Sequence, residues 1–180
     1  MGNDYLMGMI TRGGDMGIRI ASIQGGVITI PTADRYADVT IEAVNTDKAM
    51  LRMLGWNCVA TTLTYIIPWV MLMSPTIVRA ETANNNSDRD IGWNLIEFES
   101  GVKSKQTGTI YFGSGDLVKD ETIEEVAPAK SALDCLGWRG GGDTGYTFSC
   151  IELINATTIR ATRRKSGTTG EVRYQLIEFD

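Results

Sequence analysis

Hydrophobic and polar residues alternate along much of this chain in short runs, which is the pattern of half-buried β-strands. Residues 39–44 and 121–126 alternate in this way, and residues 27–30 form a β-branched run. Clusters of turn-forming residues separate these runs. The pattern predicts an all-β fold with little helix, made of short strands as in sandwich and Greek-key domains.

The end of each half of the chain has the pattern of a β-hairpin. Residues 76–81 lead into an Asn-rich loop, beyond which a second alternating run follows. The register of this predicted hairpin places Arg79 opposite Trp93 and Arg160 opposite Tyr174. Such a pair of a guanidinium and an aromatic ring would stabilise neighbouring strands.

The strand pattern occurs twice because the chain contains an internal repeat. TIEAVNTDKAMLRMLGW at 40–56 matches TIEEVAPAKSALDCLGW at 122–138 with a constant offset of 82 (122 − 40 = 82). This window would hold a helical turn or an irregular strand, with a bend at Gly55 and Gly137. Two later matches have an offset of 81 (157 − 76 = 81): 76–80 with 157–161, and 93–99 with 174–180.

The repeat divides the chain into three parts. We expect an N-terminal arm over 1–19, a β-sandwich-like module over 20–99 and a second, duplicated module over 102–180. Ser100 and Gly101 form the seam between the modules. The arm has no counterpart in the repeat, and it would be either a disordered terminus or a segment that docks on a neighbouring chain.

Composition excludes several classes of function. The chain of 180 residues has a net charge of −5, which argues against a nucleic-acid groove. It has no histidine, so the commonest general base and metal ligand is missing. Its longest apolar run, 65–73, is far too short to span a membrane.

The three cysteines do not have the spacing of a zinc site. They are Cys58, Cys135 and Cys150, with no CxxC pair among them. We expect buried free thiols, because free cysteine packs as a small hydrophobic residue. If a disulfide forms instead, Cys58 is the residue expected to be left over, since the other two belong to one module.

Two tryptophans at equivalent positions admit two interpretations. Trp56 and Trp138 could form a sugar-stacking platform, or each could be a core aromatic residue of its own module. Their repetition at one framework position favours the structural interpretation.

The acidic residues could suggest glycoside hydrolysis or calcium binding, but their positions in the repeat favour neither. Glu97 and Glu178 could be paired carboxylates for glycoside hydrolysis, yet they are equivalent residues of different modules. Asp34 with Asp116, and Asp38 with Asp120, are too sparse for a calcium loop, and we expect Asx turns there. We therefore predict no enzymatic activity, no catalytic residue, no cofactor and no metal.

Four motifs follow one another in the second module. KSKQTGTI lies at 103–110, VAPAKS at 126–131, TTIRATR at 157–163 and YQLIEF at 174–179. This arrangement resembles a repeat of structural proteins of tailed bacteriophages and prophages, whose members run as KS-x-Q-x-GTI, TI-x-x-V-x-x-x-KS, TT-x-x-A-x-R and YQ-VIEF. The first module matches more loosely, with Ala21 and Ala49 in place of a lysine and a serine.

The resemblance implies a virion component made in the host cytoplasm. We expect a capsid decoration protein on the head surface; the alternatives are a fibre, collar or tail appendage and, in another class, a carbohydrate-binding adhesin. The expected partners are other virion proteins, such as major capsid, neck or tail proteins, and further copies of the chain, with a trimer favoured. Neither nucleic acid nor a membrane is expected as a partner.

Overall fold

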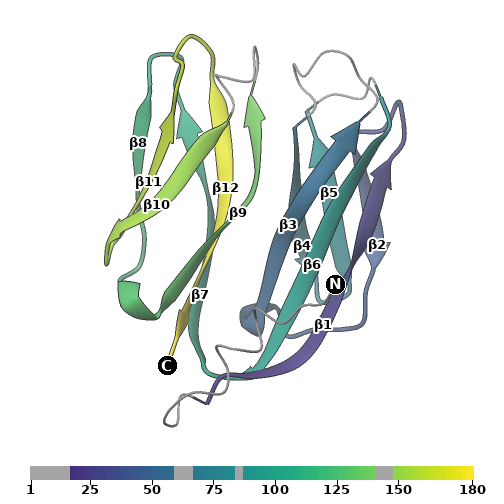
Figure 1. Ribbon diagram of the computed structural model, residues 1–180, viewed down its shortest axis with the longest axis vertical. Helices are drawn as coiled ribbons and strands as arrows, with labels where there is room; N and C mark the ends of the chain where they lie inside the picture. The colour runs from purple at the N-terminus through teal and green to yellow at the C-terminus, as the bar shows by residue number, and fades with distance from the viewer. Residues whose placement is uncertain (1–16, 59–66, 84–86, 141–147) are drawn as a thin grey trace, which may run out of the picture.

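The computed structural model describes residues 17–58, 67–83, 87–140 and 148–180. Strands make up nearly all of this part of the chain, and its only helical segments are two three-residue 3₁₀ turns. The prediction of an all-β fold with little helix is confirmed (Figure 1). None of the described residues belongs to a helix long and apolar enough to cross a membrane.

The strands fall into two successive sets of six. The first set is β1 (Arg19–Ile30), β2 (Tyr36–Thr40), β3 (Ala49–Cys58), β4 (Pro68–Ser74), β5 (Ile77–Thr82) and β6 (Arg89–Ser100), with the turn η1 (Thr46–Lys48) before β3. The second set is β7 (Val102–Phe112), β8 (Val118–Thr122), β9 (Ser131–Gly140), β10 (Ser149–Asn155), β11 (Thr158–Arg163) and β12 (Gly170–Phe179), with the turn η2 (Pro128–Lys130) before β9.

Strand pairing follows the same scheme in both sets, and all pairs are antiparallel. In the first half β6 pairs with β1 and β3, whereas β5 pairs with β2 and β4. In the second half β12 pairs with β7 and β9, whereas β11 pairs with β8 and β10. Each half therefore consists of two groups of three strands in the same order.

Each half buries one core between its two groups of strands. In the first half, Val78 of β5 and Leu95 of β6 belong to the same buried cluster, although their strands lie in different groups. In the second half, Ile159 of β11 and Leu176 of β12 are clustered in the same way. Alternating strands bury one face each, so two facing groups remove both apolar faces from water.

The predicted closing hairpin is wrong in both halves. Arg79 does not face Trp93: it lies beside β2, where it binds Asp38 through two hydrogen bonds of 2.7 and 2.8 Å and stacks 4.0 Å above the ring of Tyr36. Trp93 is buried in the core on the other group of strands. The two strands contribute to the same core from opposite sides. The chain therefore crosses from one group of strands to the other between β5 and β6.

The repeated window begins with a short turn and continues as a bent strand. The side chain of Asn45 caps η1 by accepting a hydrogen bond from Asp47 N at 3.0 Å. Gly55 and Gly137 have φ angles of 141° and 131°, and the register of β3 and of β9 against its neighbour shifts at each of them. The predicted bends are therefore present, as glycine-dependent bulges.

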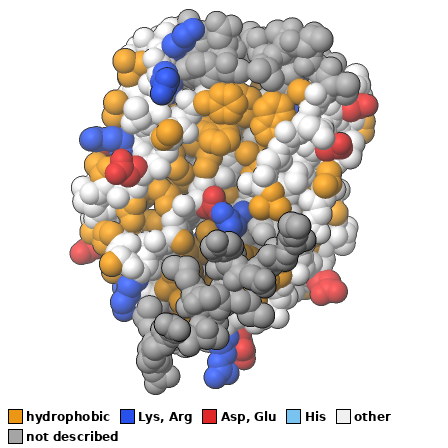
Figure 2. Space-filling model, viewed as in Figure 1, with side chains coloured by type: hydrophobic (Ala, Val, Ile, Leu, Met, Phe, Trp, Pro, Cys, Tyr) orange, Lys and Arg blue, Asp and Glu red, His pale blue; other side chains and the backbone are white. Residues whose placement is uncertain are grey.

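The two halves lie side by side (Figure 1). Ile96 and Phe98 of β6 form a buried cluster with Ile177 of β12, on the faces that point away from the two cores. Arg52 Nε lies 2.6 Å from Asp134 Oδ2 across the same junction. In the upper part of the view, hydrophobic side chains gather where the halves meet (Figure 2).

A single backbone pair also links the halves. Trp69 of β4 pairs with Gly137 of β9, so that β2-β5-β4 and β9-β12-β7 form one six-stranded sheet. A side chain at Gly137 would collide with the backbone at Pro68 and Trp69. Between β6 and β7, Gly101 turns the chain with a φ of 87°.

Candidate functional site

The motif residues hold the framework of each half. The amide of Gln24 binds the backbone of Glu42 through two hydrogen bonds of 3.0 and 2.8 Å. Gln106 makes the same pair of bonds to Glu124, at 3.0 and 2.9 Å. These residues tie the first strand of each half to the segment that follows its second strand.

The glycine of the QxG motif makes room for an aromatic ring. Gly108 pairs with Tyr174 across β7 and β12, and a Cβ atom at Gly108 would lie 2.5 Å from the tyrosine hydroxyl. Gly26 pairs with Trp93 in the first half. An aromatic residue covering a glycine on the neighbouring strand stabilises a sheet at a position without a side chain.

Glu97 and Glu178 bind separate partners, each within its own half. Glu97 accepts hydrogen bonds from Ser22 Oγ at 3.1 Å and Asn45 N at 2.7 Å. Glu178 is buried and accepts from Lys103 Nζ at 2.8 Å, from Ala127 N at 2.9 Å and from Ser104 Oγ at 3.2 Å. The hydrogen bond from Lys103, assisted by the Ala127 N–H, lowers the pKa of Glu178. Both carboxylates fix the segment before the 3₁₀ turn.

No Asx turn, in which the side chain accepts from the backbone N–H two residues further on, is found at any of the four described aspartates where the sequence predicts one. Asp38 and Asp120 lie in strands and bind Arg79 and Arg160, so the Asx-turn prediction is wrong for them. Each arginine lowers the pKa of its aspartate by hydrogen bonding. Asp116 does close a turn, by accepting a hydrogen bond from Gly113 N at 2.7 Å. Across the described ranges, no three His, Cys, Asp or Glu residues form a possible metal-binding group.

Both repeated tryptophans pack against the cores, as the structural interpretation expects. Trp56 and Trp138 are half-buried against the first and second core, respectively. The indole N–H of Trp138 donates to Ser149 O at 2.8 Å. Neither ring stands out from the surface as a stacking platform would.

The three thiols are free, and they differ in exposure. Cys58 and Cys135 are half-buried, and burial raises the pKa of Cys135 to about 12. Cys150 is exposed, so the expectation of buried thiols is wrong for this residue. It lies on β10, an edge strand of its group, where alternation turns it away from the core.

The first half has an apolar surface that the second half covers only in part. On the outer face of β1-β6-β3, Ile96 is buried at the junction, whereas its neighbour Ile23 on β1 is 61% exposed. Val27 and Leu54 continue this surface, at 63% and 61% exposed. We call Ile23, Val27 and Leu54 the outer patch. Three large apolar side chains so exposed on one sheet face are a candidate interaction surface.

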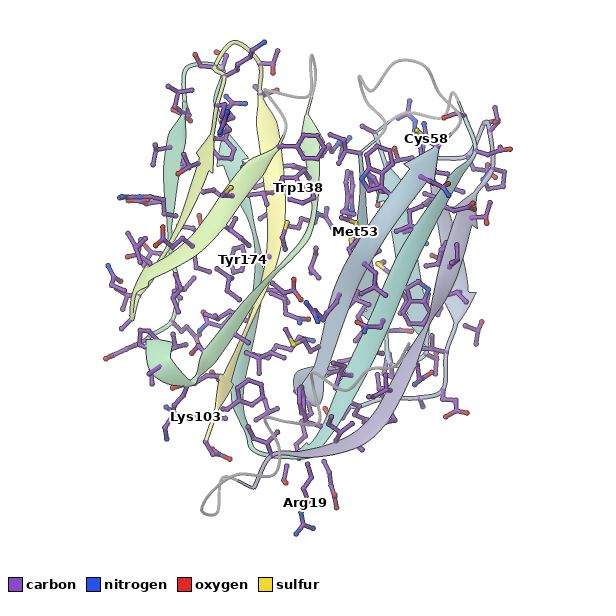
Figure 3. The ribbon with its side chains drawn as sticks, in the orientation of Figure 1. Arg19, Met53, Cys58, Lys103, Trp138 and Tyr174 are labelled. Carbon is purple, nitrogen blue, oxygen red and sulfur yellow. The ribbon has the colours of Figure 1, made fainter. Side chains whose placement is uncertain are left out.

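The edge strand beside the outer patch is poorly protected. β1 ends the order β1-β6-β3, and its only charged residue is Arg19, which projects from the lower end of the molecule (Figure 3). The corresponding strand β7 carries Lys103, whose side chain is exposed, whereas its Lys105 is turned towards the first half. An exposed lysine on an edge strand discourages pairing with other chains, so the two edges differ in their capacity for association.

Comparisons with protein-family models, with curated proteins and with solved structures gave no match to this chain.

Proposed function

We propose that this chain is a structural component of a tailed-phage virion, and specifically a capsid decoration protein. The observation that carries the proposal is the role of the motif residues. Gln106, Gly108, Glu178 and their counterparts hold strands and turns together in both halves. The residues that resemble the virion repeat thus stabilise the fold. This role is the one expected in a structural protein of a particle.

The polar residues that suggested chemistry support a structural role. The carboxylates of Glu97 and Glu178 are engaged by backbone and side-chain donors, and those of Asp38 and Asp120 by arginines. A catalytic acid pair needs two carboxyl groups free to face one substrate. We therefore assign the chain no catalytic activity and no cofactor.

The outer patch is where we place association on the particle. A decoration protein is present in many copies, and an isolated copy would leave Ile23, Val27 and Leu54 in water. Burial of these side chains by a neighbouring copy would contribute about 25 cal/mol per Å² of apolar surface. We favour a trimer, because capsid lattices offer three-fold positions and identical subunits usually form closed symmetry.

The arm over 1–19 is assigned to the same contact zone. Residues 1–16 lie outside the described part of the chain. Gly17 O accepts a hydrogen bond from Ser100 Oγ, and Ile18 packs at the junction of the halves. The first described residue, Gly17, therefore lies just before β1, the edge strand that carries Ile23 and Val27 of the outer patch.

The proposal is tested by locating the protein in electron cryomicroscopy maps of the particle. We expect density for it on the head surface, at three-fold positions. The variant carrying Ile23→Lys and Val27→Lys should fold but be missing from the head, because two charges would then face the neighbouring copy. Tyr111→Lys is the control, since Tyr111 is an exposed residue of β7 outside the outer patch.

Three results would contradict the proposal or part of it. Density on a fibre, collar or tail would replace decoration with an appendage role. Absence of the protein from purified particles would remove the virion assignment altogether. Full head occupancy by the double lysine variant would reject the outer patch as the contact surface.

A further inference from the structure

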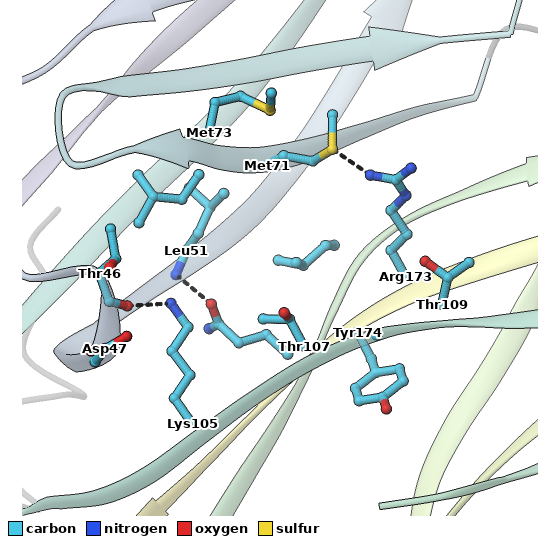
Figure 4. A pocket seen from close by; sticks show the side chains of 14 residues that line it. Thr46, Asp47, Leu51, Met71, Met73, Lys105, Thr107, Thr109, Arg173 and Tyr174 are labelled. Atoms are coloured by element: carbon cyan, nitrogen blue, oxygen red, sulfur yellow. Dashed lines mark hydrogen bonds between the residues drawn. The ribbon is translucent and has the colours of Figure 1, made fainter.

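The two halves enclose a pocket of about 470 Å³ between η1, β4 and the outer face of β7-β12 (Figure 4). This volume is in the range of small-molecule sites. One wall is apolar and comes from the first half, with Leu51, Met71 and Met73. The other wall comes from the second half and carries hydrogen-bonding side chains.

The polar wall is rich in hydrogen-bond donors. It contains Lys105, Thr107 and Thr109 of β7 beside Arg173 and Gln175 of β12. Arg173 and Lys105 are cations, and the one carboxylate among the lining residues belongs to Asp47, which is exposed. The lining therefore carries a formal charge of +1, from two cations and one anion.

Several of these donors are only partly used by the protein. Lys105 Nζ donates to Thr46 O and Ala49 O, at 2.7 Å each, and an ammonium group has three N–H bonds. Gln175 is buried: its Oε1 accepts from Leu51 N at 3.3 Å, while its Nε2 has no hydrogen-bond partner.

Arg173 is placed by contacts that leave its Nε unpartnered. Its guanidinium reaches Met71 Sδ and stacks 4.8 Å from the ring of Trp69. Its Nε is buried and has no hydrogen-bond partner. Unpartnered buried donors cost free energy, so an acceptor supplied by a ligand would be favoured here.

The polar wall does not belong to the framework that the two halves share. The residues at the positions of Lys105, Thr107, Thr109 and Arg173 in the first half are Ile23, Gly25, Val27 and Gly92. None of these four has a side chain that can donate a hydrogen bond. The donors are therefore specific to the second half, where the first half covers them.

We infer that this pocket binds a small organic anion, whose charged group meets Arg173, Gln175 and Lys105 and whose apolar body lies against Met71 and Met73. Methionine side chains adapt readily to an apolar ligand, and guanidinium and ammonium groups bind carboxylate or phosphate. The inference is independent of the proposed role in the virion.

The test is an NMR titration of the folded, full-length chain with three probes. Hexanoate supplies an anion and an apolar tail, inorganic phosphate only an anion, and hexan-1-ol only a tail. We expect saturable shifts of the Gln175 side-chain amide and the Arg173 Nε–H with hexanoate. Phosphate and hexan-1-ol should bind at least about tenfold more weakly, a factor that corresponds to 1.4 kcal/mol.

A charge variant tests the assigned residues. Arg173→Gln should weaken hexanoate binding at least about tenfold, whereas Lys130→Gln, which removes an exposed charge outside the pocket, should leave it unchanged. Absence of saturable hexanoate binding to the wild-type chain would overturn the inference. So would equal binding of hexanoate and hexan-1-ol, or of hexanoate and phosphate. The three-probe comparison uses only wild-type protein, so it holds even if Arg173→Gln does not fold.

Discussion

The rings of Phe98 and Phe179 meet edge to face between the two halves, with centroids 5.4 Å apart and planes at 78°. The two residues occupy equivalent positions of the repeat (179 − 98 = 81). Arg52 and Asp134, which form an ion pair at the same junction, are also equivalent (134 − 52 = 82). The halves thus touch partly through the same position on each side, as in the self-complementary interface of a dimer.

A double-mutant cycle at this aromatic pair should show coupling. Phe98→Leu and Phe179→Leu each keep an apolar side chain but remove the edge-to-face contact. We expect a coupling free energy of about 1 kcal/mol between them, measured by chemical denaturation. Strictly additive losses would show that the rings contribute only through their buried area.

Gly137 should tolerate alanine less well than Gly55, although both have positive φ. Gly55→Ala meets no atom within 4 Å and should cost about 1–2 kcal/mol of unfolding free energy through backbone strain alone. Gly137→Ala would place Cβ 2.5 Å from Trp69 Cα and should cost at least about 2 kcal/mol more. Equal losses in urea denaturation would mean that β4 and β9 do not approach each other closely.

Replacement of Glu178 should destabilise the chain in a pH-dependent way. Glu178→Gln removes charged hydrogen bonds at a buried site and should cost about 2 kcal/mol at neutral pH. Because the folded-state pKa of Glu178 is lowered, its stabilisation is present above its ordinary value of 4.5 and is lost as pH falls through the folded pKa. Unfolding curves of wild type and variant should therefore converge in acid, and a constant gap would contradict this account.

Lys105 should also make the stability of the chain rise with pH, in this case in alkali. Burial lowers its pKa to about 8, below its ordinary value of 10.5. The unfolded chain then binds more protons between these values, so the stability of wild type relative to Lys105→Met should rise from pH 8 to 10.5. The rise should be on the order of 2 kcal/mol, allowing for screening by water at this partly buried side chain. A flat difference across this range, by thermal or urea unfolding, would contradict the lowered pKa.

Arg89 should be replaceable without loss of stability. Its side chain is 1% exposed, and none of its three guanidinium nitrogens has a hydrogen-bond partner in the part of the chain that the structure describes. Arg89→Met should therefore be neutral or raise the unfolding free energy by about 1–2 kcal/mol. Arg163→Met is the matched control: Arg163 is also buried but donates to the carbonyls of Asp116 and Gly113, and its loss should cost about 2 kcal/mol. A large loss on Arg89→Met would reveal a partner for its charge.

Much of the fold follows from local pattern. The β-branched run 27–30 lies in β1, and the glycines before Trp56 and Trp138 marked the bulges. The alternating runs 39–44 and 121–126 were wrong as strands for most of their length, because β2 ends at Thr40 and β8 at Thr122. The closing hairpin failed because alternation tells which face of a strand is buried but not which strand lies beside it. Two consecutive strands that contribute to one core from opposite sides have the same pattern as a hairpin.

The pocket was not predicted, because its two walls come from distant parts of the chain. A signal for it exists in the repeat itself. Where the halves share a residue, as at Gln24 and Gln106, the residue serves the framework. Where they differ in hydrogen-bonding capacity, as at Ile23 and Lys105, the surroundings of the two halves differ as well. A search for repeat positions at which only one half has a hydrogen-bonding side chain would have pointed to β7.

The sheet that runs through both halves is six strands wide, yet one residue pair, Trp69 with Gly137, joins its two sides. Several strand pairs hold each half together, whereas this one backbone pair joins the halves, so bending is expected at their junction before it is expected within either half. Besides this pair, the halves are joined by the turn at Gly101 and by side-chain contacts such as those of Phe98 with Phe179 and of Arg52 with Asp134. Bending at this junction would change the angle between the two halves, while every strand within a half keeps its register.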